Sequence, residues 1–591
     1  MIADDQELLT LSKETPRELF FALGRPGSLI LLVVVLAFVP GILVLGSHQI
    51  TDDDARWGLA SLRVLQADEP HDRIGISDIS NACEFSPLAI WNIALSLKFL
   101  NSRHATGLLL SSYLAQAGVL LLMYAIGRRL FGTRAGFIGS FVLAFHASSL
   151  QHVGTPAPIA LGLMTVLLTF WGFIRYTTNH VRTVVSLWLL PSGIGLGLSL
   201  LISGPLALAS LAVLCVYVAL GSLGGSSGGG DVEHQLPAGK RLRDVWSVLI
   251  LMLIAFPVGG WWGLRLAHPD HLGETFWAVW LAAGATRDVI TADSQSLTGI
   301  VGFLAGPALL GLARTVRLVV RTTPDPESRL EGPRFLASWT VVSAVAVITG
   351  WVAFGQIATD WYGLTTVGIV WLAAVGLEEI ALRRVSARVA GGAVVVSLSA
   401  IVACTLFGAS AANHALAWIA PCLSAIAVSS LLVWWSFRFY DTYEASLRLF
   451  LVGCMLSLIA TDAVTGLASV RLGETSRDPL EQLADHLREL PEVESCTFIA
   501  VDVPARLKFS FARVWPGSRC TQVDDWSAIP STVFTEERAP EAAPHAFVLY
   551  GSSNVPLTTV AGDRIQVRAI APPTYFQSRR LSVFTVEREA D

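Results

Sequence analysis

Long apolar runs, separated by short polar segments, fill most of the chain from residue 28 to residue 468. A helix needs about 20 mostly apolar residues to cross a bilayer. The runs predict 13 spanning helices, at 28–46, 106–126, 135–150, 157–175, 185–202, 205–222, 246–264, 298–313, 337–354, 362–378, 389–410, 414–436 and 448–468. The Gly and Pro of Ser203-Gly204-Pro205 divide one long apolar stretch into two of these spans. The pattern predicts a polytopic α-helical membrane protein, preceded by a cytoplasmic segment at 1–27.

The polar segment between the first two spans, 47–103, carries two patterns of helical period. One pattern covers Asp53–Gln66 and the other covers Pro87–Leu100. Each has apolar residues broadly on one side, namely Trp57, Leu59, Ala60, Leu62 and Leu65 in the first and Leu88, Trp91, Leu95 and Phe99 in the second. We expect two helices that lie on the membrane surface.

The composition changes at about residue 469, directly after the last predicted span of the membrane region 28–468. That span is 448–468. An amphipathic pattern with a proline near its start predicts a helix at Asp478–Leu490. Short runs rich in β-forming residues predict strands at Thr497–Val501, Lys508–Val514, Ala546–Tyr550, Ile565–Ile570 and Leu581–Val586. Residues 469–591 are therefore expected to form a small soluble α/β domain.

The distribution of Lys and Arg predicts the orientation of the chain in the membrane. With the N-terminus inside, the inner loops are rich in arginine, whereas the short outer loops after the spans ending near 150, 202, 354 and 410 hold no Lys or Arg. This orientation places loop 47–103 and the C-terminal domain outside the cytoplasm. The expected location is the inner (plasma) membrane, with the C-terminal domain periplasmic.

Composition excludes some classes of protein. Only 15% of the residues are charged, compared with about 25% in an average soluble domain. The net charge of −5 lacks the basic surplus of a nucleic-acid binder. Two of the seven cysteines, Cys496 and Cys520, fall in the C-terminal domain. If that domain is exported, a disulfide between them is allowed, and two free thiols are the alternative. No pattern indicates the oligomeric state.

Three carboxylates and an arginine directly follow the first predicted span, in the run Ile50–Trp57. Charged groups are costly inside a bilayer but can lie at its rim, where they can meet a lipid-borne substrate and a metal ion. The alternative is that Asp52, Asp53 and Asp54 only cap the surface helix, because carboxylates stabilise its positive N-terminal dipole.

Four motifs follow one another along the first part of the chain. They are Asp53-Asp54-Ala55-Arg56-Trp57, Pro87-Leu88-Ala89-Ile90-Trp91, the run GRRLFGTRAG at 127–136, and Gly204-Pro205. This order resembles the GT-C glycosyltransferases of the protein O-mannosyltransferase and aminoarabinose-transferase type. Members of that family have an Asp-Glu pair after the first span, an outer Pro-Leu-x-x-Trp helix, a cytoplasmic G-R-R-L-F-G-x-R-A-G turn and a Gly-Pro kink. The similarity is good over residues 28–222.

The resemblance implies a membrane glycosyltransferase that transfers a sugar from a polyprenyl-phosphate donor to an extracytoplasmic lipid, glycan or protein. By position, Asp53 would be the general base, with Asp54 supporting it and Arg56 pairing with a phosphate. The same two carboxylates are the candidate ligands of a divalent metal ion (Mg, Mn or Zn), which would stabilise the leaving phosphate. Other residues expected to bind substrate are Trp57, Glu84, Trp91, Asp360 and Tyr362. The expected partners are the lipid-linked donor and membrane lipids, with no nucleic acid.

Some positions depart from the family pattern. Ser86 stands where the family often has a Lys, and Pro156-Ala157 stands where it usually has Pro-Asp. These departures keep open a non-catalytic relative that binds lipid-linked glycan. A transporter is the less favoured alternative, because the predicted spans are almost free of charge at mid-membrane and show no internal repeat.

Overall fold

The structure of the chain is a computed structural model. It describes residues 33–35, 38, 50, 52–66, 86–100, 106–146, 149, 156, 158–178, 186–223, 238–261, 304–320, 331–354, 359–381, 385–386, 389–397, 399, 479–488, 495–499, 503–515, 519–523, 545–550, 565–569, 574–576 and 579–588. Contacts divide the chain into two compact units. The first comprises Met1–Gly46, Ser112–Gly154 and Pro158–Val470, and the second comprises Ser47–Ser111, Thr155–Ala157 and Arg471–Asp591. The loop after the first predicted span therefore belongs to the same unit as the C-terminal region.

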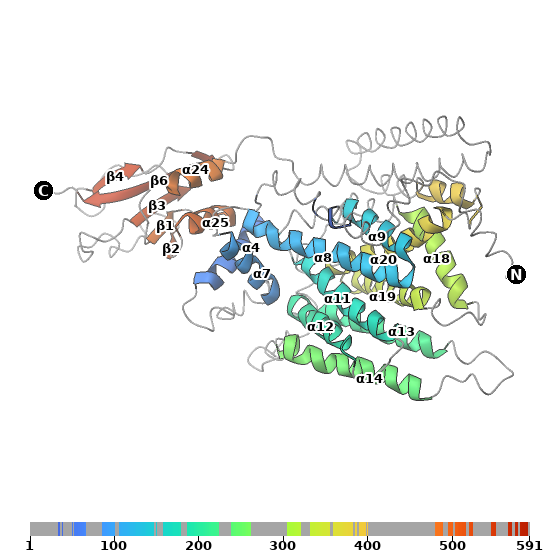
Figure 1. Cartoon of the computed structure of the whole chain (residues 1–591). Coiled ribbons are helices and arrows are strands. Elements are labelled where there is room, and N and C mark those ends of the chain that lie inside the picture. Colours follow the sequence, from blue (N-terminus) through green and yellow to red (C-terminus); the bar gives the residue numbers. More distant parts are fainter. Residues whose placement is uncertain are drawn as a thin grey trace, which may run out of the picture. The chain divides into compact units, whose positions relative to one another are not determined.

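The first unit is built of helices. Its α-helices, labelled in Figure 1, are most of α8 (Thr106–Leu130), α9 (Thr133–Phe145), α11 (Ile159–Thr177), α12 (Leu189–Ile202), α13 (Gly204–Leu223), α14 (Ala238–Ala255), α18 (Ala305–Val320), α19 (Glu331–Phe354) and α20 (Thr359–Ala381). The π-helical turn η2 (Phe256–Gly260) follows α14. Among the described residues, five helices are long and apolar enough to cross a membrane: Thr106–Leu130, Ile159–Thr177, Gly204–Gly221, Glu331–Thr349 and Gly363–Ile380. The chain is a multi-pass membrane protein.

Each predicted span from 106 to 378 overlaps a described helix, although several of the bounds differ. The spans predicted at 414–436 and 448–468 lie outside the described residues, as do most of 28–46 and part of 389–410. The count of 13 spans therefore stays a prediction. The predicted interruption at Ser203-Gly204-Pro205 is confirmed, because α12 ends at Ile202 and Ser203 is extended, with φ −156° and ψ 118°.

The glycines of the GRRLFGTRAG turn let α8 and α9 approach each other closely. A Cβ at Gly127 would lie 2.7 Å from the Cα atom of Gly136, and a Cβ at Gly136 would lie 2.5 Å from the backbone nitrogen of Arg128. Gly132, between the helices, has φ +105°, a conformation that favours glycine. Arg129 donates to the hydroxyl of Thr178 (2.9 Å) and to its carbonyl oxygen (3.1 Å), at the C-terminal end of α11. In this structure the motif is a helix-packing corner.

Aromatic side chains form the centre of the first unit. Trp339 of α19 and Trp371 of α20 meet edge to face at 5.1 Å between ring centroids, and Phe335 lies 5.6 Å from Trp371. The indole nitrogen of Trp339 donates to the carbonyl oxygen of Leu364 (3.0 Å), so its polar atom is satisfied in the core.

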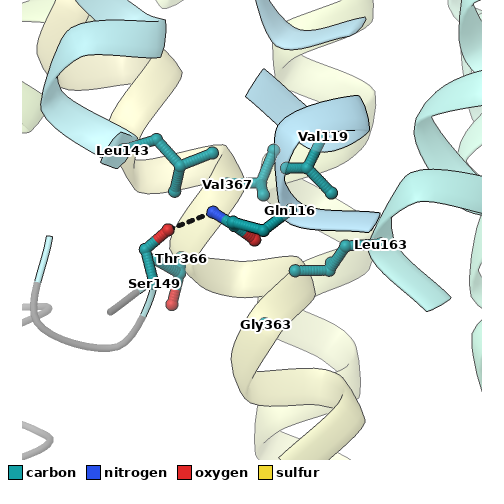
Figure 2. Close-up of a pocket in the computed structure, with 8 residues that line it drawn as sticks. All are labelled: Gln116, Val119, Leu143, Ser149, Leu163, Gly363, Thr366 and Val367. Carbon is teal, nitrogen blue, oxygen red and sulfur yellow. Dashed lines mark hydrogen bonds between the residues drawn. The ribbon is translucent and has the colours of Figure 1, made fainter. Parts of the chain in front are cut away.

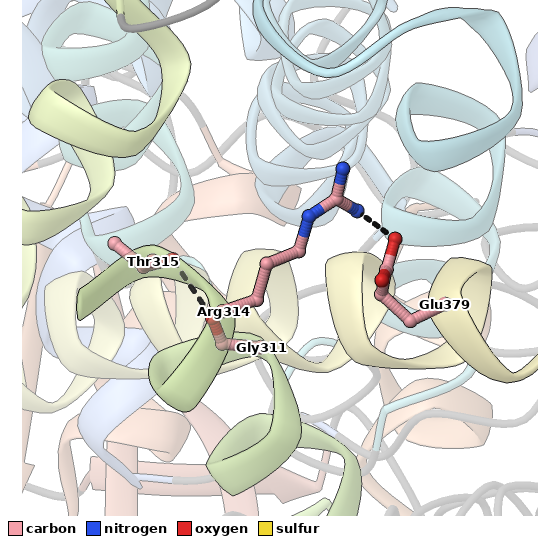
Figure 3. Close-up of polar contacts among 4 residues, drawn as sticks. All are labelled: Gly311, Arg314, Thr315 and Glu379. Carbon is pink, nitrogen blue, oxygen red and sulfur yellow. Dashed lines mark hydrogen bonds and ion pairs between the residues drawn. The ribbon is translucent and has the colours of Figure 1, made fainter. Parts of the chain in front are cut away.

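Helices α18 and α20 are joined by an ion pair as well as by close backbone packing. Figure 3 shows Arg314 of α18 directed at the carboxylate of Glu379 in α20. Their side chains are 30% and 12% exposed, so the pair is partly shielded from water. A Cβ at Gly311 or at Gly376 would collide with backbone atoms of the other helix, which indicates that the two backbones are in contact.

The second unit contains a six-stranded mixed sheet in the order β2-β1-β3-β6-β4, with β5 also paired to β6. The strands are β1 (Ser495–Ile499), β2 (Arg519–Val523), β3 (His545–Tyr550), β4 (Ile565–Ala569), β5 (Thr574–Phe576) and β6 (Arg579–Arg588). Strands β1, β2 and β3 are parallel, whereas β6 runs antiparallel to β3, β4 and β5. Two helices, α24 (Pro479–Arg488) and α25 (Ala505–Val514), share a buried core with β1, β3 and β6 (Figure 1).

The predicted strand at Lys508–Val514 is wrong, because these residues belong to the helix α25. Buried residues alternate there (Leu507, Phe509, Phe511, Arg513) as they would in a strand. The alternation arises because two faces of the helix are buried: Leu507 and Phe511 pack in the core beneath the sheet, and Phe509 packs against α4 (Asp52–Gln66). The other four predicted strands and the predicted helix at Asp478–Leu490 are present, and β2 and β5 are additional strands.

The two cysteines of the C-terminal domain lie on neighbouring strands. Cys496 of β1 is opposite Cys520 of β2 in the parallel register. The predicted closeness of these two residues is confirmed, and Cys496 is disulfide-bonded.

Candidate functional site

The predicted acidic site forms the first turn of α4. Asp52, Asp53 and Asp54 are the first three residues of this helix. The side chain of Asp54 is 3% exposed and has an interaction partner, whereas the side chains of Asp52 and Asp53 lie outside the described part of the chain. The first N–H groups of a helix have no partner within the helix, so this turn favours negative charge. A carboxylate in the first turn of α4 can therefore cap the helix or be held in place as part of a functional site.

Helix α4 is held in the second unit by close packing on α25. A Cβ at Gly58 would lie 2.7 Å from Cδ2 of Phe509 and closer still to Cε2. Phe509 is 1% exposed and belongs to a hydrophobic cluster that also contains Ala55 and Leu62 of α4. Only a glycine at position 58 lets the ring approach the helix backbone so closely. This packing fixes the direction of the acidic first turn.

The other predicted residues near the acidic turn differ in exposure. Arg56 is exposed and has an interaction partner. Trp57 is 9% exposed and packs in the cluster with Ile93 and Leu97 of α7 (Pro87–Phe99). Trp91 of α7 is partly exposed. The predicted residue Glu84 lies outside the described residues.

Helix α7 has two apolar faces. Ile90, Ile93 and Leu97 are buried against neighbours in the second unit, whereas Leu95 is 66% exposed and Phe99 is 82% exposed. The exposed residues belong to the stripe that predicts contact with the membrane surface. Both predicted surface helices are present, as α4 and α7, and their contact with lipid stays a prediction.

The remaining candidates lie in the first unit. Asp360 and Tyr362 are in the first turn of α20, and their side chains lie outside the described part of the structure. The described site residues predicted from the sequence thus fall into two groups. One group lies in α4 and α7 of the second unit, and the other lies at the start of α20 in the first unit.

A small, mostly apolar cavity in the first unit, lined in part by polar side chains, was not predicted from the sequence. It is lined by Gln116, Val119, Leu143, Ser149, Leu163, Gly363, Thr366 and Val367. Figure 2 shows the Gln116 amide directed at the Ser149 hydroxyl, with which it forms a hydrogen bond. The signal that could have indicated this site is a glutamine within an apolar span, because polar groups inside a membrane are often functional.

No group of three or more His, Cys, Asp or Glu side chains that could hold a metal ion occurs among the described residues. Near the acidic turn, Asp54 is the one predicted metal ligand whose side chain the structure describes. The described donors therefore do not make up a metal site.

Comparison with known proteins places these features in a known fold. Residues 84–226 match the family model described as dolichyl-phosphate-mannose-protein mannosyltransferase. ArnT from Cupriavidus metallidurans bound to undecaprenyl phosphate superposes with a TM-score of 0.54 and 14% sequence identity, over 94% of this chain and 97% of that chain. Its apo structure gives the same TM-score at 15% identity. The chain has the fold of a GT-C glycosyltransferase.

The resemblance to the GT-C family is thereby confirmed, over 84–226 by the family model and over most of the chain by the GT-C fold. The archaeal oligosaccharyltransferase AglB from Archaeoglobus fulgidus superposes less well, with a TM-score of 0.48 and 11% identity over 84% of this chain and 64% of that chain. A short stretch also resembles the urease accessory protein UreD of Methylobacterium sp. (strain 4-46), with 35% identity over 114 residues. That stretch is 19% of this chain and 36% of that curated relative.

Proposed function

We propose that this GT-C protein transfers a sugar from a polyprenyl-phosphate donor to an extracytoplasmic acceptor, which is a lipid, a glycan or a protein. The proposal is supported by the ArnT fold, since one ArnT structure contains undecaprenyl phosphate. The observation that carries it is the acidic first turn of α4, whose sequence resembles the Asp-Glu pair of that family. We place the protein in the inner membrane, with residues 47–103 and 469–591 on the periplasmic side.

In this reaction an acceptor hydroxyl, amine or phosphate attacks the anomeric carbon of the donor sugar. The new glycosidic bond forms as the bond between that carbon and the phosphate oxygen breaks, and polyprenyl phosphate leaves with the electron pair. In our proposal Asp53 takes the proton of a hydroxyl or amine acceptor. A residue at the start of a packed helix is suited to this role, because a base must be held within hydrogen-bond reach of the acceptor.

The burial of the neighbouring residues is compatible with two supporting roles. Asp54 is almost fully buried and has an interaction partner, so in the proposed site it orients the turn. Arg56 is exposed, and its planar guanidinium matches the oxygens of a phosphate. Trp57 contributes packing beneath the turn, and Trp91, Glu84, Asp360 and Tyr362 are proposed contacts with donor or acceptor. A divalent metal held by Asp53 and Asp54 would stabilise the leaving phosphate, and the side chain of Asp53 lies outside the described residues.

One observation favours a second function, a non-catalytic protein that binds lipid-linked glycan. Ser86 occupies the position where the family often has a Lys. Its hydroxyl accepts a hydrogen bond from the backbone nitrogen of Ala89 (3.3 Å), and the residue is 3% exposed. This side chain caps α7 and cannot supply the positive charge that a lysine would offer to a phosphate.

The two functions differ in a direct measurement on the purified full chain in lipid nanodiscs. The probes are undecaprenyl phosphate for binding and a panel of radiolabelled polyprenyl-phosphate sugars for transfer. Saturable binding together with release of polyprenyl phosphate supports the transferase. Binding without release under all acceptor conditions supports the non-catalytic protein. Absence of both would overturn the proposed use of a polyprenyl-phosphate ligand.

A further inference from the structure

An amide side chain is buried near the middle of the mostly apolar helix α8. Gln116 of α8 is 4% exposed. Its Nε2 atom donates a hydrogen bond to the hydroxyl of Ser149, a residue that follows α9 and is 3% exposed. Its Oε1 atom has no hydrogen-bond partner among the described residues. A buried carbonyl oxygen without a donor is destabilising, so native proteins usually supply one from protein or from bound water.

The amide lies in a cavity of matching size. The cavity has room for about one water molecule. Figure 2 shows Gln116, Ser149 and Thr366 as the polar side chains of this cavity. The remaining walls are apolar, from Val119, Leu143, Leu163 and Val367. A charged ligand would be poorly solvated among these walls.

The hydrogen-bonding capacity of the two polar groups defines the ligand. When Ser149 accepts from the amide, its own O–H needs an acceptor, and Oε1 of Gln116 needs a donor. If the amide is rotated by 180°, its NH₂ group needs an acceptor instead. One hydroxyl group or one water molecule can donate and accept in both arrangements. An ammonium group cannot accept, and a carboxylate cannot donate.

We propose that Gln116 and Ser149 bind one hydroxyl-type group, which is either a water molecule or an alcohol group of a lipid-linked substrate. The site connects α8 and the segment after α9 to α20, because Gly363 and Thr366 form part of its wall. Gly363 directly follows the turn of α20 that carries Asp360 and Tyr362, and Thr366 lies about one turn further along. A group bound here would lie between Gln116 of α8 and the wall that Gly363 and Thr366 of α20 form.

Radiolytic hydroxyl-radical footprinting of the full chain in nanodiscs tests this site, because bound water generates radicals where bulk water does not reach. Leu163, 5% exposed, lines the cavity, and Leu214 of α13, 0% exposed, is the matched leucine that does not. Without added donor, we expect labelling of Leu163 at least several-fold above that of Leu214. Gln116→Leu should reduce it to the level of Leu214. Ser140→Ala should leave it unchanged, because the Ser140 hydroxyl already donates to carbonyl oxygens of Leu120 and Gly136.

The source of the hydroxyl group follows from repeating the experiment with a polyprenyl-phosphate sugar. Protection of Leu163 by the sugar-bearing lipid, but not by undecaprenyl phosphate, would show that a sugar hydroxyl replaces the water. Unchanged labelling would show that the site keeps its water. If Gln116→Leu does not fold, Ser149→Ala serves as the second variant. Labelling of Leu163 no higher than Leu214 in the parental protein would overturn the proposal, whatever the outcome of the transfer assay.

Discussion

The corner between α8 and α9 offers a clean test of why the GRRLFGTRAG motif is rich in glycine. In the variant Gly136→Ala, the new Cβ would lie 2.5 Å from the backbone nitrogen of Arg128 and 2.9 Å from the carbonyl oxygen of Tyr124. Ordinary contact begins at 3.4 Å, so the two helices must separate by about 1 Å to remove the clash. Backbone atoms cannot rotate away as the end of a side chain can.

The magnitude follows from two opposing effects. Forcing extra volume into a packed interior costs about 1–3 kcal/mol, whereas replacing glycine by alanine within a helix gains about 0.5–1 kcal/mol. Gly139→Ala, in the same helix, isolates the second effect, since its Cβ would lie 3.4 Å from Met123 and 3.5 Å from Ala374. The two variants should therefore differ in free energy of unfolding by about 1–3 kcal/mol, with Gly136→Ala the less stable.

The assay is thermal unfolding of the purified full chain in one detergent, followed by intrinsic tryptophan fluorescence. We expect the melting temperature of Gly136→Ala to fall below that of the parental chain and that of Gly139→Ala to stay equal or rise. Equal melting temperatures for the two variants would refute the explanation that close backbone approach requires glycine in this motif.

Three further predictions concern other contacts. Gly58→Ala should destabilise the second unit by about 1–3 kcal/mol, and adding Phe509→Leu to this variant should partly restore its stability, as measured by hydrogen exchange of β1 and β3. A double variant that is no more stable than Gly58→Ala would contradict the contact between Gly58 and Phe509. Arg314→Met and Glu379→Gln should each lower the melting temperature, and a double-mutant cycle should give a coupling energy of about 0.5–3 kcal/mol; additive effects would exclude the ion pair. A fluorophore on Phe99→Cys should be quenched by spin-labelled lipid in nanodiscs, whereas quenching only by aqueous iodide would exclude lipid contact.

Much of the fold follows from the sequence because membrane helices have a strong local signal. The predicted spans from 106 to 378 each overlap a described helix, and the break at Ser203 follows from the conformational limits of Gly204 and Pro205. The two helices of the outer loop are also predictable, since their apolar residues repeat with helical period. The sequence pattern did not indicate that this loop forms one unit with the C-terminal domain, because such contacts are non-local.

Other features depend on tertiary packing and were missed for that reason. Helix α25 resembles a strand in sequence, because Leu507 and Phe509 are buried against different neighbours. Strand β5 has only three residues, and β2 lies at the edge of the sheet, where it pairs with β1 alone. The glutamine within an apolar span was the one local signal of the cavity at Gln116, whose walls come from residues far apart in the sequence. The acidic turn could be predicted from the sequence because Asp52, Asp53 and Asp54 are adjacent in the chain and need no tertiary contact to come together.

The central claim is that the start of α4 supplies the base for sugar transfer, and the isosteric pair Asp53→Asn and Asp52→Asn tests it most directly. Both variants remove one carboxylate from the same helical turn, so they change the capping of α4 in a similar way. Transfer from a radiolabelled polyprenyl-phosphate sugar is measured with purified full chain of equal melting temperature. We predict that Asp53→Asn lowers the rate by about 10²–10⁴-fold and that Asp52→Asn keeps the parental rate. An Asp53→Asn protein that transfers sugar at the parental rate would contradict the account and leave Asp53 as a helix cap.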